Sequence, residues 1–188
     1  LKTCLEITDL ELKAVILPKD YINVKKRTYV KHFFKISRSF ALEISFLAKK
    51  HSIPIYYYPF HDSSFIKFLD SQKESIDLGI VASFNSLLDR ETLKIPLGGF
   101  INIHSSFLPM HRGNNPIFWS IRNGEKESGV TLHYVSEKFD MGNIILQKKI
   151  KLKADETYFT LEEKLIQHSK KLLIDFFKLN KNHKDIKS

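Results

Sequence analysis

The chain has 188 residues, of which 43% are hydrophobic, as expected of one globular domain with a substantial core. No apolar run is long enough to cross a membrane, and the first ten residues carry charges that a signal peptide lacks. The single cysteine, Cys4, excludes an intramolecular disulfide and fits a reducing, cytoplasmic compartment. The eight histidines are scattered without ligand spacing, so we expect no metal site.

The net charge of +9 comes from a surplus of lysine and arginine. Such a charge favours anionic partners, including nucleotides, nucleic acid and polyglutamylated cofactors. A solvated lysine-rich surface is the alternative. We favour that alternative because the lysines are not interleaved with the arginine and aromatic stripes typical of nucleic-acid binding.

The hydrophobic pattern predicts strands that alternate with helices. In chain order, we expect a helix ending near residue 10, a strand over 12–17, a helix capped by Ser39, a strand over 53–58, a helix capped by Asp62 or Ser63, a strand over 78–82, and a turn capped by Asp89. There follow a strand over 100–104, a helix from Asn115 and Pro116 to Gly124, antiparallel strands over 129–135 and 144–152, a helix opened by a capping box at Thr160–Glu163, and a basic tail from about 181. This order predicts a single α/β domain over 1–188, with a Rossmann-like, mainly parallel sheet and helices on both faces.

Two polar residues, Asn102 and His104, interrupt the apolar run FINIH. In a strand, residues two apart point to the same face, so the amide and the imidazole are expected side by side. They stand at the carboxyl end of their strand, where ligands bind in α/β sheets. Asp140 follows in a loop between two predicted strands. An amide, an imidazole and a carboxylate can together polarise a carbonyl and move a proton, which indicates an acyl-transfer site.

Three segments, INIHSSFLP, RGNNPIFWSIRNGE and GVTLHYVSEKFDMGNII, resemble the folate-dependent formyltransferase family. That family includes methionyl-tRNA, glycinamide ribonucleotide and sugar N-formyltransferases. The resemblance implies 10-formyltetrahydrofolate as the co-substrate and a primary amine as the acceptor. It makes Asn102 and His104 the donors to a tetrahedral oxyanion. Asp140 would hold the imidazole and raise its pKa.

The resemblance also implies binding residues around this centre. It places the pterin against Phe84, Asn85, Ser86, Leu87 and Leu88, and against Phe139, Met141 and Gly142. Ser106, Arg112 and Gly113 are its candidates for the acceptor, with a turn-forming serine and an exposed loop arginine as the alternatives. We expect His133 to be structural, Thr131 to support the site, and Phe118 and Trp119 to lie in the core.

The chain departs from the family pattern in three places. The loop reads Asp140-Met141-Gly142-Asn143 where the family has Asp-Thr-Gly-Asp. The family's first strand and the C-terminal barrel of a typical methionyl-tRNA formyltransferase have no counterpart in these residues, so we expect a truncated catalytic domain. Without that first strand, the strands over 12–17 and 78–82 lack a shared neighbour, which predicts a gap or an apolar groove between them.

The leading hypothesis is an enzyme that transfers a formyl group to a small amine, most simply an amino sugar attached to a nucleotide. Methionyl-tRNA formylation is an alternative that the basic surface supports and the missing barrel opposes. Hydrolysis of formyltetrahydrofolate is another alternative, because it uses the same three residues. An inactive or folate-binding fragment is the non-enzymatic alternative. We expect no membrane partner.

Overall fold

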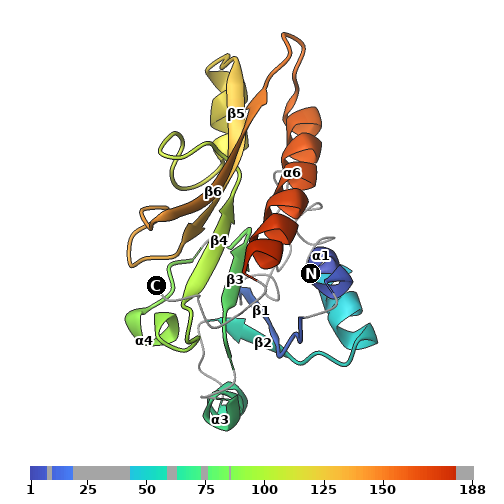
Figure 1. Cartoon of the computed structure of the whole chain (residues 1–188), viewed down its shortest axis with the longest axis vertical. Coiled ribbons are helices and arrows are strands. Elements are labelled where there is room, and N and C mark those ends of the chain that lie inside the picture. Colours follow the sequence, from blue (N-terminus) through green and yellow to red (C-terminus); the bar gives the residue numbers. More distant parts are fainter. Residues whose placement is uncertain (8–9, 19–42, 59–62, 73–75, 85, 181–188) are drawn as a thin grey trace, which may run out of the picture. The chain divides into compact units, whose positions relative to one another are not determined.

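The computed structural model describes residues 1–7, 10–18, 43–58, 63–72, 76–84 and 86–180 (Figure 1). Its chain divides into two compact units, Leu1–Gln72 and Lys73–Ser188. The basic stretch over 19–35, the predicted helix caps Ser39 and Asp62, and the tail over 181–188 lie outside the described residues.

The first unit contains a short parallel sheet. Its elements are α1 (Lys2–Glu6), β1 (Val15–Pro18), a helical stretch over 43–50, β2 (Ile55–Tyr58) and α3 (Ser63–Gln72). Val15 lies opposite Ile55 in the β1–β2 pair. Both strands begin two or three residues later than the sequence predicts, and Ser63 is the first residue of α3 instead of its cap.

The second unit is built on a four-stranded sheet in the order β3-β4-β5-β6. Its elements are β3 (Gly79–Ala82), α4 (Arg90–Leu93), β4 (Phe100–His104), α5 (Pro116–Arg122), β5 (Glu127–Tyr134), β6 (Ile144–Lys151) and α6 (Tyr158–Leu179). The pair β3–β4 is parallel, whereas β4–β5 and β5–β6 are antiparallel. The predicted α/β class, the FINIH strand and the antiparallel pair are confirmed, and Asp89 caps α4 by accepting the Thr92 N–H at 2.8 Å.

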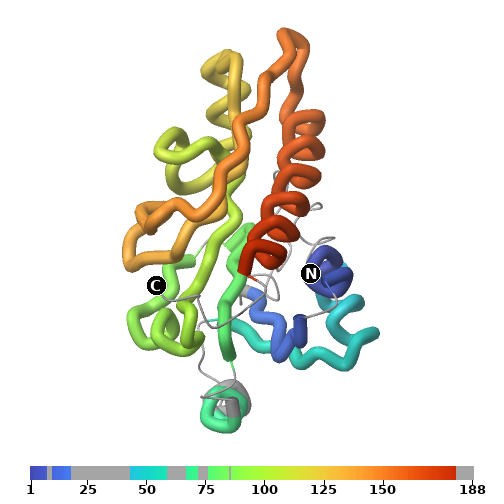
Figure 2. The backbone as a smooth tube through the Cα atoms, viewed as in Figure 1, coloured from blue at the N-terminus to red at the C-terminus, as the bar shows by residue number. Residues whose placement is uncertain are grey.

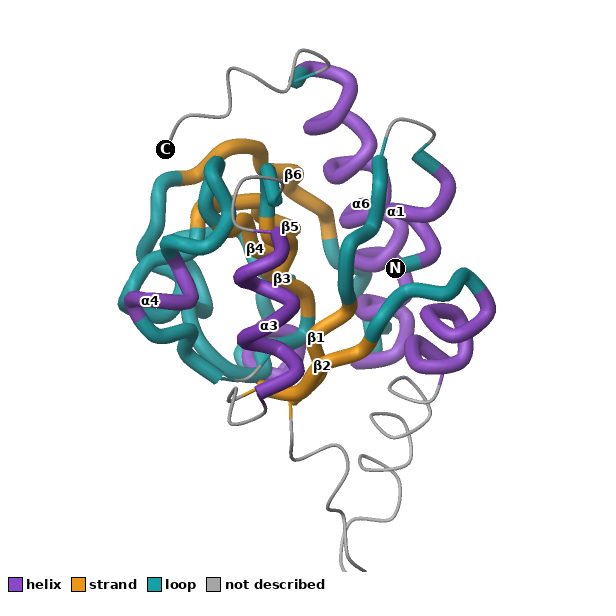
Figure 3. The backbone as a smooth tube through the Cα atoms, turned by 90° about the horizontal axis from the view of Figure 1, so that it is seen from below, coloured by secondary structure: helices purple, strands orange, loops and turns teal. Residues whose placement is uncertain are grey.

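Helix α6 runs along one face of this sheet (Figures 1 and 3). The strand side chains on that face include Ile101, Val130 and Leu132, none of which is exposed to solvent. Helix α6 contributes apolar residues at helical spacing, and those buried are Leu161, Leu165, Leu172, Leu173, Phe176 and Phe177. Burying an aliphatic or aromatic side chain of this size stabilises a fold by about 1.5–3 kcal/mol, so this layer is the main core of the unit.

The start of α6 corrects a prediction. Thr157 is the N-cap and accepts the Thr160 N–H at 3.2 Å, while the Thr160 hydroxyl accepts the Thr157 N–H at 3.0 Å. The reciprocal box therefore spans Thr157–Thr160, and the predicted box at Thr160–Glu163 is wrong. Glu156 partly explains why α6 begins at this position, because its carboxylate, just before the helix, accepts hydrogen bonds from Thr160 and Lys164.

Strands β1 and β3 belong to separate sheets within the described residues. The groove predicted between them concerns the relative placement of the two units and stays a prediction, as does the single domain. Among the described residues, no helix combines the length and the apolar character needed to cross a membrane.

Candidate active site

Strands β4 and β5 bring four polar side chains to one face of the sheet. Asn102 lies opposite His133, and His104 lies opposite Thr131. Directly opposed residues of an antiparallel pair point the same way, so all four side chains share the face away from α6. His104, Thr131 and His133 are buried, with 7%, 0% and 1% of their surface exposed. Buried polar groups need hydrogen-bond partners, and nearby loops supply them.

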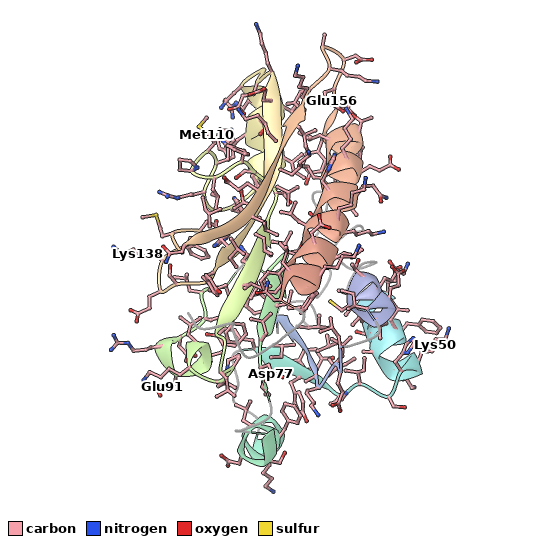
Figure 4. All side chains as sticks on the ribbon, viewed as in Figure 1. Lys50, Asp77, Glu91, Met110, Lys138 and Glu156 are labelled. Carbon is pink, nitrogen blue, oxygen red and sulfur yellow. The ribbon has the colours of Figure 1, made fainter. Side chains whose placement is uncertain are left out.

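Asp140 joins the sheet residues to the loop that follows β4. Its Oδ1 accepts an N–H from Asn102 Nδ2 at 3.1 Å, and its Oδ2 accepts the Gly113 N–H at 2.7 Å. The same Oδ2 lies 3.6 Å from His104 Nδ1. Asp140 sits in the loop between β5 and β6, which lies on the same side of the sheet as the loop after β4 (Figure 2). Met110 and Lys138 mark these two loops in Figure 4. The structure thus brings the three catalytic candidates together.

The hydrogen bonds fix which nitrogen of His104 carries a proton. A carbonyl oxygen can only accept, so the 2.8 Å contact between His104 Nε2 and the His111 carbonyl requires an N–H on Nε2. In the neutral imidazole the lone pair is therefore on Nδ1, which faces Asp140. A second proton, when it arrives, is placed on Nδ1 beside the carboxylate.

Burial decides the pKa of His104. Desolvation lowers that pKa, the His111 carbonyl and the Asp140 charge raise it, and the net result lies below the ordinary value of 6.5. The prediction that Asp140 gives His104 a raised pKa is therefore wrong in its net direction, because burial outweighs the carboxylate. For Asp140, burial acts in the other direction and raises the pKa. The contacts of this carboxylate with His133, His104 and Gly113 lower the pKa by more, so the net pKa falls below the usual range. At neutral pH the pair is a neutral imidazole beside a carboxylate.

His133 is a member of this cluster that the sequence did not indicate. Its Nδ1–H donates to the Tyr134 carbonyl at 2.7 Å, so the neutral ring has its lone pair on Nε2, and only the protonated ring can donate from Nε2 to Asp140. Asn102 Nδ2 lies 3.2 Å from that nitrogen, and Asp140 Oδ1 lies 3.3 Å from it. The two N–H groups of Asn102 are thus directed at His133 and Asp140. Only the register of β4 against β5 identifies this contact.

The loop after β4 is held by buried hydroxyl groups. Ser106 is fully buried and donates to the Met110 carbonyl at 2.6 Å, which fits the turn-forming alternative for this serine. The Thr131 hydroxyl donates to the Ser106 carbonyl at 2.7 Å and accepts the Leu108 N–H at 3.0 Å. It also accepts from Gln147 Nε2 at 2.9 Å. Thr131 therefore supports the site from the neighbouring strand.

Comparison with known proteins places this cluster in a family. A family profile described as "Formyl transferase" matches residues 61–177, more than half of the chain, and its span includes every side chain of the cluster. The chain belongs to the formyltransferase family.

The relatives include methionyl-tRNA formyltransferases. The one from Thermotoga maritima is 39% identical over 131 residues, which are 69% of this chain and 41% of that protein. The one from Pseudothermotoga lettingae is 37% identical over 132 residues, which are 70% of this chain and 41% of that protein. The chain thus spans about two fifths of the length of these curated relatives.

Solved formyltransferases share the fold. Phosphoribosylglycinamide formyltransferase from Bacillus halodurans superposes with a TM-score of 0.58 at 33% identity, covering 66% of this chain and 68% of that chain. The formyltransferase PseJ from Anoxybacillus kamchatkensis, solved with UDP-4,6-dideoxy-4-formamido-L-AltNAc and tetrahydrofolate, gives 0.58 at 22% identity over 91% of this chain and 77% of that chain.

The predicted pterin-binding residues that the structure describes lie in two loops, one after β3 and one between β5 and β6. Phe139 and Met141, on either side of Asp140, are 48% and 49% exposed. A Cβ on Gly142 would lie 1.8 Å from the Tyr134 carbonyl oxygen, so this position requires glycine for close packing of the loop. In the loop after β3, Leu88 is buried, Leu87 is exposed, Phe84 and Ser86 are half-buried, and Asn85 lies outside the described residues.

The residues predicted to bind the acceptor and the aromatic residues of α5 are placed differently from one another. Gly113 contributes its backbone N–H to the site, while the Arg112 side chain is exposed. Phe118 and Trp119 are also exposed, and the Arg122 guanidinium lies 5.8 and 5.4 Å from their ring centroids. The prediction that these aromatics form the core is wrong. The inward positions of the short helix α5 are Ile117 and Ser120, which are both buried.

Proposed function

We propose that this chain transfers a formyl group from 10-formyltetrahydrofolate to a primary amine. The observation that carries the proposal is the Asp140 carboxylate, which binds Asn102 and the Gly113 N–H and faces His104 at the carboxyl end of β4. Membership of the formyltransferase family supports it. The donor supplies the formyl group. The acceptor nitrogen bonds to the formyl carbon, the bond from that carbon to N10 breaks, and one proton moves from the acceptor nitrogen to N10.

Asn102 is assigned to the oxyanion. Its amide already holds two N–H groups in place through His133 Nε2 and Asp140 Oδ1. One of them turns toward the formyl oxygen when the donor binds. A fixed donor of this kind contributes about 2.7–4 kcal/mol to the stabilisation of a developing oxyanion.

His104 is assigned to the proton. Because its pKa is lowered, the imidazole is neutral at neutral pH, and its Nδ1 can accept the proton that the acceptor nitrogen loses as it bonds to the formyl carbon. The cation so formed lies 3.6 Å from Asp140 Oδ2. Only 8% of each of these two side chains is exposed, so little water screens their attraction. The imidazolium then returns the proton to the departing nitrogen.

The loops supply a fitting environment for the donor. Phe139 and Met141 present exposed apolar side chains on both sides of Asp140, which suits contact with the flat face of the pterin ring. We assign the rest of the pterin contacts to the backbone of residues 84–88. Among the described residues, no group of three His, Cys, Asp or Glu side chains is arranged to hold a metal ion.

For the acceptor we propose an amino sugar attached to a nucleotide. The exposed Arg112, next to the Gly113 backbone that binds Asp140, offers a cation for a phosphate at the edge of the site. The second candidate is methionyl-tRNA, because relatives at 37% and 39% identity are methionyl-tRNA formyltransferases.

One assay separates these functions. The chain is supplied with 10-formyltetrahydrofolate and with UDP-linked 4-amino sugars, methionyl-tRNA or no amine, and release of tetrahydrofolate is followed together with the formylated product. Formamide formation with the amino sugar supports the proposed acceptor. Formamide formation with methionyl-tRNA supports the second candidate instead. Release without amine indicates hydrolysis. Donor binding without turnover under every condition refutes catalysis and leaves a folate-binding protein.

A further inference from the structure

His111 contacts the catalytic imidazole through its backbone and a carboxylate through its side chain. Its carbonyl accepts the His104 Nε2–H at 2.8 Å. Its own Nε2–H donates to Glu125 Oε1 at 2.6 Å. The His111 and Glu125 side chains are 13% and 20% exposed, so the contact is shielded from bulk water. One residue thus connects Glu125 to His104.

His111 is held in an uncommon backbone conformation. Its φ is +53°, in the left-handed region that residues with a Cβ seldom adopt. A conformation of this kind persists only where surrounding contacts impose it. The two contacts that the structure shows for His111 are the Glu125 carboxylate on the side chain and the His104 N–H on the carbonyl.

Glu125 sits on a well-anchored turn. It follows Gly124, whose φ is +62°, and its backbone N–H donates to the Ser120 carbonyl at 3.1 Å. The turn joins the end of α5 to the start of β5. Because β5 is the strand that carries Thr131 and His133, the Glu125 carboxylate is fixed relative to the same sheet face as the site.

We propose that Glu125 and His111 form a positioning pair that holds the loop after β4 so that the His111 carbonyl fixes the His104 tautomer. With the pair intact, the Nε2–H of His104 is committed to the His111 carbonyl, and the Nδ1 lone pair faces Asp140. Without Glu125, the loop relaxes from the left-handed conformation, the carbonyl moves away and the proton can shift to Nδ1. The tautomer that accepts a proton on Nδ1 is then depleted. This inference rests on the proposed function for its kinetic consequence only.

The test combines kinetics with a spectroscopic measurement. Glu125→Ala and His111→Phe each remove the pair, and Glu127→Ala is the matched control because Glu127 forms an exposed ion pair with Lys149 at 3.0 Å. We expect Glu125→Ala and His111→Phe to lower kcat by about 10–100-fold, the effect of a small misplacement of a catalytic group. The KM for 10-formyltetrahydrofolate should change less than about twofold, because neither residue is assigned to the donor. The control should leave kcat unchanged.

The ¹⁵N resonances of the His104 imidazole provide the independent measurement. In the wild-type protein they should report an N–H on Nε2, and in Glu125→Ala a mixture of both tautomers. Circular dichroism and thermal unfolding show that each variant is folded. A folded Glu125→Ala protein with the wild-type ¹⁵N pattern overturns the positioning pair. If no acceptor supports turnover, the proposed function fails, but the tautomer measurement still decides this inference.

Discussion

Replacing Asp140 with asparagine tests the centre of the site with little change in shape. In the wild-type protein both carboxylate oxygens accept, one from Asn102 and one from the Gly113 N–H. An asparagine side chain has one oxygen, so its NH2 group must face one of these two donors. The variant also removes the negative charge 3.6 Å from His104 Nδ1.

The size of the effect follows from these contacts. Two unit charges 3.6 Å apart attract each other by roughly 4–5 kcal/mol at an effective dielectric constant of about 20. One charge-assisted hydrogen bond adds about 1.5–3 kcal/mol. The His104 cation is present in the transition state and not in the resting enzyme. Removing the Asp140 charge therefore raises the activation barrier by most of this Coulomb energy. We expect kcat/KM to fall by about 10³-fold.

The assay measures tetrahydrofolate release with the best acceptor from acidic to alkaline pH, beside an NMR titration of His104. Since the Asp140 charge is one of the influences that raise the pKa of His104, the variant should show a still lower pKa for that imidazole. A thermal unfolding curve controls for loss of fold. A folded variant that keeps more than about a tenth of wild-type kcat/KM, or one in which the His104 pKa rises, contradicts this role of Asp140.

Three further predictions concern packing and acid stability. Gly142→Ala places a methyl group against the Tyr134 carbonyl, so we expect a loss of about 1–3 kcal/mol in the free energy of unfolding and reduced turnover, and unchanged values of both would contradict the packing. The Lys164 ammonium lowers the pKa of Glu156 to about 2, so its stabilisation is present above pH 4.5 and is lost as the pH falls toward 2; urea unfolding of Glu156→Gln should show a flatter acid limb than wild type. The pKa of His104 is lowered on folding, so the unfolded chain binds the extra proton first and stability falls as the pH drops below 6.5; His104→Gln should remove that part of the pH dependence.

The sequence predicted the parts of the site that depend on local pattern. The FINIH run is a strand with the predicted bounds, and its alternation places Asn102 and His104 on one face. Asp140 was predicted to join them because of the family resemblance, and the structure shows that it follows a strand that pairs with theirs. The contribution of His133 was missed, since it depends on the pairing of Asn102 with His133 across two strands.

Energetic balances were harder to predict than positions. The sequence predicts that Asp140 lies close to His104, but the direction in which the pKa of His104 shifts depends on how deeply the imidazole is buried. The start of α6 is a similar case, because Thr157 and Thr160 are both plausible caps and the chosen box depends on Glu156. Phe118 and Trp119 were misplaced because a seven-residue helix buries only a narrow stripe.

The saturated hydroxyl of Thr131 has a consequence for protein engineering. Its one hydrogen and two lone pairs are all used, by Ser106, Leu108 and Gln147, so two of its three hydrogen bonds hold the loop after β4. A loop transplanted from a relative keeps this support only where its backbone presents a carbonyl and an N–H at the places of Ser106 and Leu108. Grafts that aim to change the acceptor should therefore exchange the loop and the residue at position 131 as one unit, with position 147 as its third member.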